Sequence, residues 1–326
     1  MKKHKVYVTR AIPKEGIELL SQTCEVQVNP HDRPLTQDEL FEAIADADGV
    51  IGLLSERIDG TFFNAAPKLK GYANYAVGFD NIDVEEATRR GVPVSNTPDV
   101  LTIATAEMAW ALLFSVCRHI PASDKLVRND SWKGWSPLQF IGAEVTGKTL
   151  GIVGAGRIGR AMAQMSKGFN MKVFYFSRTK KPDFEKALNA KKVELNELLT
   201  QSDFISLHTP LTPETRHMFN ADSFKKMKNT AYLINTARGP VVDESALVEA
   251  LKSGEIAGAG LDVYEFEPKL TPGLRELDNV VLAAHTGSAT DTARSNMALL
   301  AAKNLLAMLE GGNPPTCLNP QVLTYM

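Results

Sequence analysis

The sequence has little cysteine. Cys24, Cys117 and Cys317 are the only three among its 326 residues, and they lie far apart along the chain. This spacing excludes a disulfide framework and a metal site built from paired cysteines. It favours a reducing compartment, so we expect a cytoplasmic protein that binds no metal.

The sequence also lacks an excess of charge and a long apolar run. Its 36 Lys and Arg residues against 38 Asp and Glu give a net charge of −2, which argues against binding to nucleic acid or to an anionic membrane. The most apolar stretch, residues 108–117, is well short of the ~20 residues that a membrane-spanning helix requires. We therefore expect a small-molecule ligand, with neither a nucleic-acid nor a membrane partner.

Short apolar runs alternate with helical segments along most of the chain. Residues 5–9 and 49–53 have the composition of buried strands, and Thr36 with Glu39 fits a capping box at the start of a helix. Residues 103–118 form a long helical pattern that is hydrophobic enough to be buried. A second alternating series begins at Thr149 and continues to His285. This rhythm predicts an α/β fold with doubly wound parallel sheets, and the length of the chain predicts two domains.

A glycine-rich segment, GAGRIG at residues 154–159, follows a predicted strand and precedes a predicted helix that starts at Arg160. In that context the glycines are typical of a dinucleotide site. Gly154 permits a tight turn, Gly156 lets a pyrophosphate approach the backbone, and Gly159 lets the helix pack closely on the strand. The helix N-terminus then offers N–H groups to the phosphates. The alternative is an ordinary glycine turn.

The end of the next predicted strand, residues 172–176, distinguishes NAD from NADP. An NAD site places Asp or Glu there to bind the ribose 2′-hydroxyl, whereas this chain has Ser177, Arg178 and Thr179. A hydroxyl followed by a guanidinium suits a 2′-phosphate. We therefore expect NADP, while a solvated basic turn at the same place would leave NAD acceptable.

Polar side chains follow the later predicted strands, where the carboxyl ends of parallel strands form the ligand-binding edge. Reduction of a 2-oxo acid needs a cation for the substrate carboxylate, an acid for the carbonyl oxygen and a carboxylate beside that acid. Arg238, His285 and Glu267 suit these roles. Arg238 as a surface ion-pair residue and Glu267 as a solvated loop carboxylate are the alternatives.

Two choices remain open at this point. His208 follows a predicted strand just as His285 does, so position alone does not identify the acid. Asp262 either reaches the nicotinamide or caps a turn.

The chain resembles the D-specific 2-hydroxyacid dehydrogenases, and within them the glyoxylate and hydroxypyruvate reductase branch, over nearly its whole length. The resemblance rests on the glycine loop and on NYAVGFDNID at residues 74–83, SRT at 177–179, NTARG at 235–239, GLDVYEFEP at 260–268 and HTGSAT at 285–290. It implies Arg238, Glu267 and His285 as the catalytic residues. In one respect the chain departs from the family pattern, because Ala284 rather than proline precedes the histidine.

The resemblance also implies the remaining site residues and the organisation of the chain. The substrate-binding residues would be Leu53, Ala76, Val77, Gly78, Arg238 and His285. The cofactor-binding residues would be Gly154, Gly156, Arg157, Ile158, Gly159, Ser177, Arg178, Thr179, Thr209, Ala237, Asp262 and Gly287. A dinucleotide-binding domain at residues 101–288 would be inserted into a substrate domain formed by residues 1–100 and 289–326. The family implies a homodimer, in which Trp135 resembles a tryptophan that some reductases place in the partner's active site.

The expected activity is hydride transfer from NADPH, or NADH, to glyoxylate or hydroxypyruvate, giving glycolate or D-glycerate. One alternative is another D-2-hydroxyacid dehydrogenase that acts on phosphoglycerate or a bulkier 2-oxo acid. An alternative of another class is a non-catalytic corepressor or scaffold that senses nucleotides.

Overall fold

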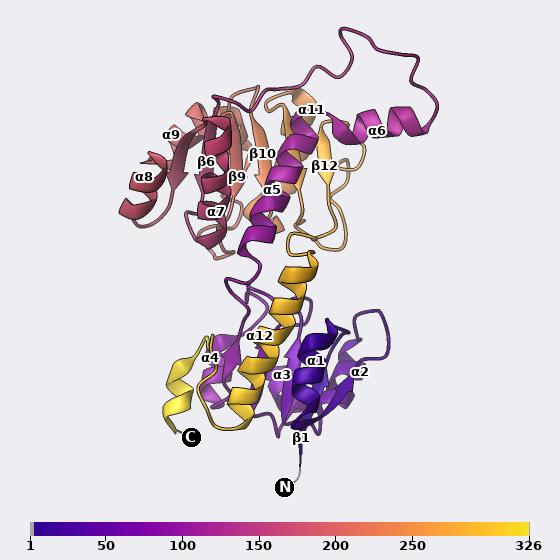
Figure 1. Ribbon diagram of the computed structural model, residues 1–326, viewed down its shortest axis with the longest axis vertical. Coiled ribbons are helices and arrows are strands. Elements are labelled where there is room, and N and C mark those ends of the chain that lie inside the picture. The colour runs from indigo at the N-terminus through magenta and orange to yellow at the C-terminus, as the bar shows by residue number, and fades with distance from the viewer. Residues whose placement is uncertain (1–2, 326) are drawn as a thin grey trace. The chain divides into compact units, whose positions relative to one another are not determined.

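The computed structural model describes residues 3–325, and the chain forms two compact units. Unit 1 comprises Met1–Leu101 and Ala289–Met326, and unit 2 comprises Thr102–Ser288. Each unit is built on one parallel β-sheet, in agreement with the predicted fold class (Figure 1).

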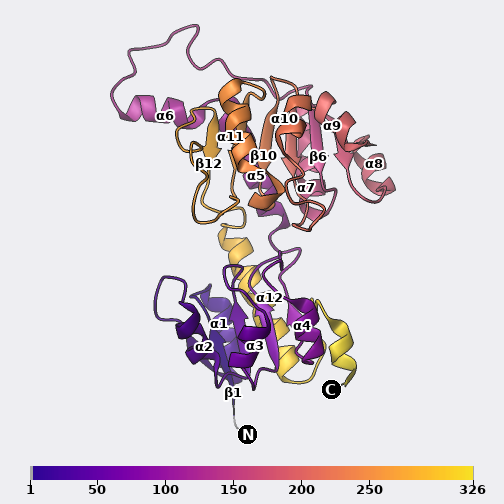
Figure 2. The same ribbon diagram turned by 180° about the vertical axis from the view of Figure 1, so that it is seen from behind.

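The sheet of unit 1 has the strand order β2-β1-β3-β4-β5, which is the flavodoxin-like doubly wound order. Helices α1 and α12 cover one face, and α2, α3 and α4 cover the other (Figures 1 and 2). The strands are β1 (His4–Val8), β2 (Cys24–Val28), β3 (Gly49–Gly52), β4 (Gly71–Asn74) and β5 (Val94–Ser95). The helices are α1 (Lys14–Ser21), α2 (Gln37–Ile44), α3 (Gly60–Ala65), α4 (Val84–Arg89), α12 (Asp291–Leu309) and the short 3₁₀ helix η3 (Pro320–Tyr325).

Two local features stabilise the fold of unit 1: a helix cap and the packing of a helix on glycines. The predicted capping box is present at the start of α2, where the Thr36 hydroxyl accepts from the Glu39 N–H and the Glu39 carboxylate accepts from the Thr36 N–H. Helix α12 packs on glycines: a Cβ on Gly16 would lie 2.7 Å from the Ala298 carbonyl oxygen, and one on Gly71 would lie 2.7 Å from the Met308 sulfur. The C-terminal helix therefore completes the core of the N-terminal strands.

The sheet of unit 2 has the order β12-β11-β10-β9-β6-β7-β8, which is the dinucleotide-binding order with one strand added. Its strands are β6 (Thr149–Val153), β7 (Lys172–Phe176), β8 (Lys191–Lys192), β9 (Phe204–Leu207), β10 (Tyr232–Asn235), β11 (Gly258–Leu261) and β12 (Val280–Leu282). Its helices are α5 (Thr102–Cys117), α6 (Ile120–Arg128), α7 (Arg157–Met165), α8 (Pro182–Leu188), α9 (Leu195–Gln201), α10 (Ala221–Lys226) and α11 (Glu244–Ser253), with 3₁₀ turns η1 (Ser166–Phe169) and η2 (Gly239–Val241).

Two hydrophobic clusters fill the faces of this sheet. One cluster lies between the sheet and α5, α7 and α8, and the other lies between the sheet and α9, α10 and α11 (Figures 1 and 2). The prediction that residues 103–118 form a buried helix is confirmed by α5, nine of whose residues are buried. No single helix among residues 3–325 has the length and apolar character of a membrane span, although the bent pair α5 and α6 together meets both criteria.

Two details of unit 2 differ from the sequence prediction. The helix after the glycine loop begins at Arg157 rather than at Arg160, because Gly156 occupies the N-cap position. Helix α6 was not predicted, since none of its residues is buried and its pattern is not set by a core. This helix and the loop after it protrude from the unit (Figures 1 and 2).

Candidate active site

The glycine loop lies at the point where the strand order of unit 2 reverses, between β6 and β9. Gly154 has φ of +97°, and a Cβ there would lie 2.5 Å from the His208 carbonyl oxygen. A Cβ on Gly159 would lie 2.2 Å from the carbonyl oxygen of Gly154, whereas one on Gly156 would meet nothing within 4 Å. Two glycines are thus needed for packing and one faces open space, which is the arrangement a pyrophosphate at the α7 N-terminus requires.

The segment after β7 carries hydroxyl and guanidinium groups. The Ser177 hydroxyl donates to the Thr179 carbonyl at 2.7 Å, and Arg178 is exposed. A hydrogen bond with Thr212 and, to a smaller extent, the charge of Arg178 lower the pKa of Glu214. Arg178 therefore lies near the loop after β9, on the side of the sheet edge that carries the glycine loop.

His285 and Glu267 form a close pair. The Nδ1 atom of His285 lies 2.9 Å from Oε2 of Glu267, and the two side chains are 30% and 32% exposed. Burial alone would raise the pKa of Glu267, but the hydrogen bond and charge of His285, the Tyr264 N–H and the charge of Arg238 together lower that pKa below its ordinary value. The carboxylate is therefore ionised, and it faces an imidazole that water and a small ligand can reach.

Backbone contacts hold this pair in place. His285 itself has φ of +52°, an unusual conformation for a side-chain-bearing residue that its surroundings must stabilise. The buried carboxylate of Asp262 accepts the N–H groups of Thr286 and Gly287, each at 2.7 Å. Burial raises the pKa of Asp262. Of the two roles predicted for Asp262, the turn-holding one is present in the structure.

Tyr264 links the two strands that carry the pair. Its hydroxyl donates to the Ala283 carbonyl at 2.6 Å, and its N–H donates to Oε1 of Glu267 at 2.9 Å. Tyr264 lies within the motif at residues 260–268, but the sequence alone predicts no role for it, because a buried tyrosine after a strand is ordinary core composition.

Arg238 follows β10 and lies next to the same loop. Its Nη1 donates to the Ala237 carbonyl at 2.8 Å, and the buried Asn235 side chain bonds the Arg238 carbonyl and the Ala237 N–H, each at 3.0 Å. A Cβ on Gly239 would lie 1.9 Å from the Tyr264 backbone. Only glycine therefore allows the Arg238 segment to pack on the loop that carries Glu267.

His208, the rival candidate, has different surroundings. Its Nε2 lies 2.9 Å from the Ser206 hydroxyl and 3.2 Å from the Met162 sulfur. Burial lowers the pKa of His208 from 6.5 to about 3. The ring is therefore neutral near pH 7, so it lacks the imidazolium form that acts as a general acid.

The candidate substrate residues Leu53 and Ala76 to Gly78 belong to unit 1. The Leu53 N–H is bonded to the Glu56 carboxylate, and Asn81 donates to the Leu53 carbonyl at 3.2 Å. Burial raises the pKa of Glu56. The loop after β3 is thus fixed by two side chains that sequence reasoning did not single out.

The second unit 1 segment is fixed through its carbonyl groups. The Thr97 N–H donates to the Ala76 carbonyl at 2.8 Å, Asn96 donates to that of Val77 at 2.7 Å, and Asn74 donates to that of Gly78 at 2.8 Å. These bonds set the directions of the backbone N–H groups between them.

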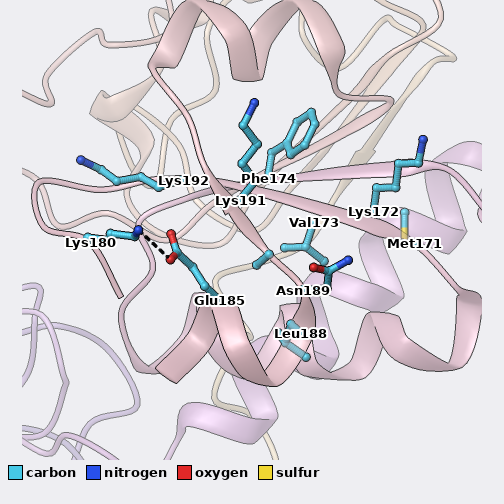
Figure 3. A pocket seen from close by; sticks show the side chains of 11 residues that line it. Met171, Lys172, Val173, Phe174, Lys180, Glu185, Leu188, Asn189, Lys191 and Lys192 are labelled. Atoms are coloured by element: carbon cyan, nitrogen blue, oxygen red, sulfur yellow. Dashed lines mark ion pairs between the residues drawn. The ribbon is translucent and has the colours of Figure 1, made fainter. Parts of the chain in front are cut away.

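A separate hollow of about 840 Å³ lies at the edge strand β8, away from the carboxyl ends of the central strands (Figure 3). Lysines line it, and two are paired: Lys180 lies 3.3 Å from Glu185, and Lys191 lies 2.7 Å from Glu197. It brings together no candidate catalytic residue. Among residues 3–325, no three His, Cys, Asp or Glu side chains are grouped as metal ligands.

The glycine loop, the polar ends of β9 to β12 and the histidine–carboxylate pair lie along one edge of the unit 2 sheet. Together they define an NAD(P)-dependent oxidoreductase. The family model described as "D-isomer specific 2-hydroxyacid dehydrogenase, NAD binding domain" matches residues 110–287. The chain belongs to this family, whose members transfer a hydride between a nicotinamide and a 2-hydroxy or 2-oxo acid.

Similar proteins match nearly the whole chain. A glyoxylate reductase of Thermococcus onnurineus is 54% identical over 325 residues, which are 98% of this chain and 97% of that protein. A glyoxylate reductase of Pyrococcus furiosus is 53% identical with the same coverage. Among solved structures, the glyoxylate reductase from Paecilomyes thermophila has a TM-score of 0.87 at 33% identity, covering 98% of this chain and 100% of that chain. An NADPH-dependent glyoxylate/hydroxypyruvate reductase from Sinorhizobium meliloti, in complex with NADP and malonate, has a TM-score of 0.85 at 32% identity, covering 97% of both chains.

Proposed function

We propose that this chain is a glyoxylate and hydroxypyruvate reductase that uses NADPH in preference to NADH and forms glycolate and D-glycerate. The observation that carries the proposal is the 2.9 Å contact between His285 Nδ1 and Glu267 Oε2. The names of the full-length relatives support the choice of substrate.

In this proposal His285 donates the proton to the substrate carbonyl oxygen. Because Nδ1 faces Glu267, Nε2 is the nitrogen that carries this proton. Glu267 orients the ring and stabilises the imidazolium before transfer. Arg238 binds the substrate carboxylate with its planar fork.

In this proposal loops of unit 1 also bind the substrate. The N–H groups of Val77 and Gly78 donate to its carboxylate, and Leu53 and Ala76 limit its size. The small side chains of the segment from Ala76 to Gly78 favour small acids such as glyoxylate and hydroxypyruvate. Unit 1 acts in this way as the substrate domain, with its first part near residues 1–100 and its return near residues 289–326, and the intervening residues form the cofactor domain.

A nicotinamide dinucleotide, when bound, supplies the hydride. The glycine loop and the start of α7 bind its pyrophosphate, because the loop offers open space at Gly156 and α7 offers N–H groups. The residues that form this part of the site are Gly154, Gly156, Arg157, Ile158 and Gly159. Ser177, Arg178 and Thr179 hold the 2′-phosphate. Thr209, Ala237, Asp262 and Gly287 line the path from the ribose to the nicotinamide.

The substrate proposal is tested by turnover with a panel of 2-oxo acids. With NADPH, glyoxylate and hydroxypyruvate should give the highest kcat/KM, above those of phosphohydroxypyruvate and bulkier acids. Chiral chromatography of the glycerate should show the D isomer. A preference for a bulkier acid would overturn the substrate assignment, and L-glycerate would overturn the proposed geometry.

The cofactor proposal is tested by Arg178→Ala. Loss of one charge-assisted contact should lower kcat/KM for NADPH by about 10- to 100-fold while that for NADH stays near the wild-type value. Lys181→Ala, four residues after Ser177, is the control and should keep the preference. A wild-type enzyme that prefers NADH would overturn the assignment.

We further propose that the protein is a cytoplasmic homodimer assembled through the arm formed by α6 and residues 129–142. The arm exposes large apolar side chains, with Trp135 83% and Leu138 80% exposed. Burial of such groups against a second copy would be favourable. Light scattering should show a dimer for the wild type. The double variant Trp135→Ala/Leu138→Ala should dissociate into monomers at a higher protein concentration than the wild type does.

A further inference from the structure

The loop from Glu265 to Thr271 carries Glu267, and one buried carboxylate contacts both of its ends. Glu244, the first residue of α11, is 1% exposed. Its Oε1 accepts the Glu265 N–H at 2.7 Å, and its Oε2 accepts the Thr271 hydroxyl at 2.7 Å. Because a carboxylate is rigid and planar, these two bonds fix the separation of the loop ends.

The contact between α11 and the loop is reciprocal. The Glu265 carboxylate accepts the Glu244 N–H at 3.3 Å, and it also lies 2.6 Å from Nε2 of His217 and 3.7 Å from Arg216. Burial raises the pKa of Glu244, and Tyr264 is the other titratable group close to it. The start of the helix and the start of the loop are thus joined by two side chains, each bonded to the backbone of the other.

Joining a helix to a loop through two adjacent buried carboxylates has a high desolvation cost. Well-packed apolar side chains achieve similar stability without the desolvation cost. Hydrogen bonds to both loop ends fix direction as well as distance, which apolar packing does not. The arrangement therefore suits a segment that must hold one side chain in a defined position.

That side chain is Glu267. It lies between the two clamped ends, next to the exposed Phe266, and its carboxylate points to His285. The same loop receives the Arg238 segment through Gly239. A shift of the loop would therefore change the distance from Glu267 to His285 and its relation to Arg238 together.

We propose that Glu244 is a positioning residue of the reaction: through Glu265 and Thr271 it sets the place of the Glu267 carboxylate against His285. Its two carboxylate oxygens bond the two ends of the loop. The inference rests on the proposed function, in which Glu267 and His285 transfer the proton.

The direct test is Glu244→Gln in the full-length protein. The amide keeps the shape but presents an NH₂ group to one of the two donors. We expect kcat to fall by about 10- to 100-fold, the size of a misplaced catalytic group, with the KM for NADPH unchanged. The alkaline limb of the reduction profile should move to lower pH, because the imidazolium loses a well-placed carboxylate.

Two further variants control for folding. Thr271→Val removes one end of the clamp with little change of shape and should give a smaller change in the same direction. Glu249→Gln, on the same helix but exposed and paired with Lys252 at 3.1 Å, should leave kcat and the pH profile unchanged. If Glu244→Gln does not fold, Thr271→Val carries the test.

A double-variant cycle separates positioning from general damage. In a Glu267→Gln background, Glu244→Gln should cost no further activity, because the group it positions is already lost. The inference would be overturned if the activity losses of the two substitutions multiply in the double variant. It would also be overturned if Glu244→Gln and Thr271→Val both keep the wild-type kcat and pH profile. Full activity in Glu267→Gln alone would instead overturn the proposed function, so the two failures are distinct.

Discussion

His208 and His285 both follow strands of the same sheet, at the same edge, yet their surroundings are opposite. His208 contacts a hydroxyl and a thioether, and burial lowers its pKa to about 3. His285 contacts an ionised carboxylate and keeps nearly a third of its side chain exposed. The comparison shows that position at the ligand-binding edge does not make a histidine an acid. A neighbouring carboxylate and access for the substrate do.

The largest expected effect is that of His285→Ala. Loss of a positioned acid should lower kcat for reduction by about 10²- to 10⁴-fold, while NADPH affinity, measured by fluorescence titration, stays close to that of the wild type. Near-normal turnover in this variant would show that His285 is not the acid and would make His208 the candidate.

Glu267→Gln sharpens the comparison by giving His285 a neutral neighbour, as His208 has. The pKa of Glu267 is below its ordinary value, so the wild-type carboxylate is ionised across the neutral range. Its negative charge favours the imidazolium, the form that donates the proton. Without it, the alkaline limb of kcat/KM for reduction should move to lower pH. A pH–rate profile that matches the wild type would exclude the pair as a functional unit.

The smallest effect on turnover is expected for His208→Gln, whose consequence lies in stability. Between pH 6.5 and about 3 the unfolded chain binds a proton on this histidine and the folded chain does not. The free energy of unfolding of the wild type should therefore decrease as the pH falls below 6.5, with this residue contributing up to about 1.4 kcal/mol per pH unit. The variant lacks that contribution, so urea unfolding at pH 7 and pH 5 should show a smaller difference than in the wild type. Equal differences would contradict the neutral state of His208 in the folded chain.

The sequence predicts the elements of the sheets well because their signals are local. The strand at residues 172–176 has the predicted bounds, and the capping box of α2 is present. Helix α6 lacks such a signal, since it buries no face. The start of α7 was placed three residues late, because Gly156 caps the helix through its backbone conformation and offers no side chain to recognise.

The sequence predicts the residues of the candidate site that carry a chemical group needed for the reaction. It does not predict the residues that hold the loops of the site in place. Charge, strand ends and resemblance lead to Arg238, Glu267 and His285 as the proposed catalytic residues. Glu244 and Tyr264 bond backbone groups 21 and 19 residues away in the sequence, so no spacing rule reveals them. Glu56 bonds the Leu53 N–H only three residues earlier, but no motif around it predicts that contact. The choice between the two histidines likewise depends on burial and on a partner 18 residues away.

The packing of α12 on the N-terminal strands has a consequence for biosynthesis. Gly16 and Gly71 are shaped to receive this helix, which ends at Leu309. Unit 2 comprises Thr102–Ser288, a continuous segment, and its sheet is complete once β12 has left the ribosome. The first 101 residues must instead wait for nearly the whole chain, because the part of their sheet that α12 covers stays open for the time needed to add some two hundred residues. At about 5–20 residues per second this interval lasts on the order of ten seconds or more, so the nascent N-terminal segment exposes apolar surface long after its own strands have been synthesised.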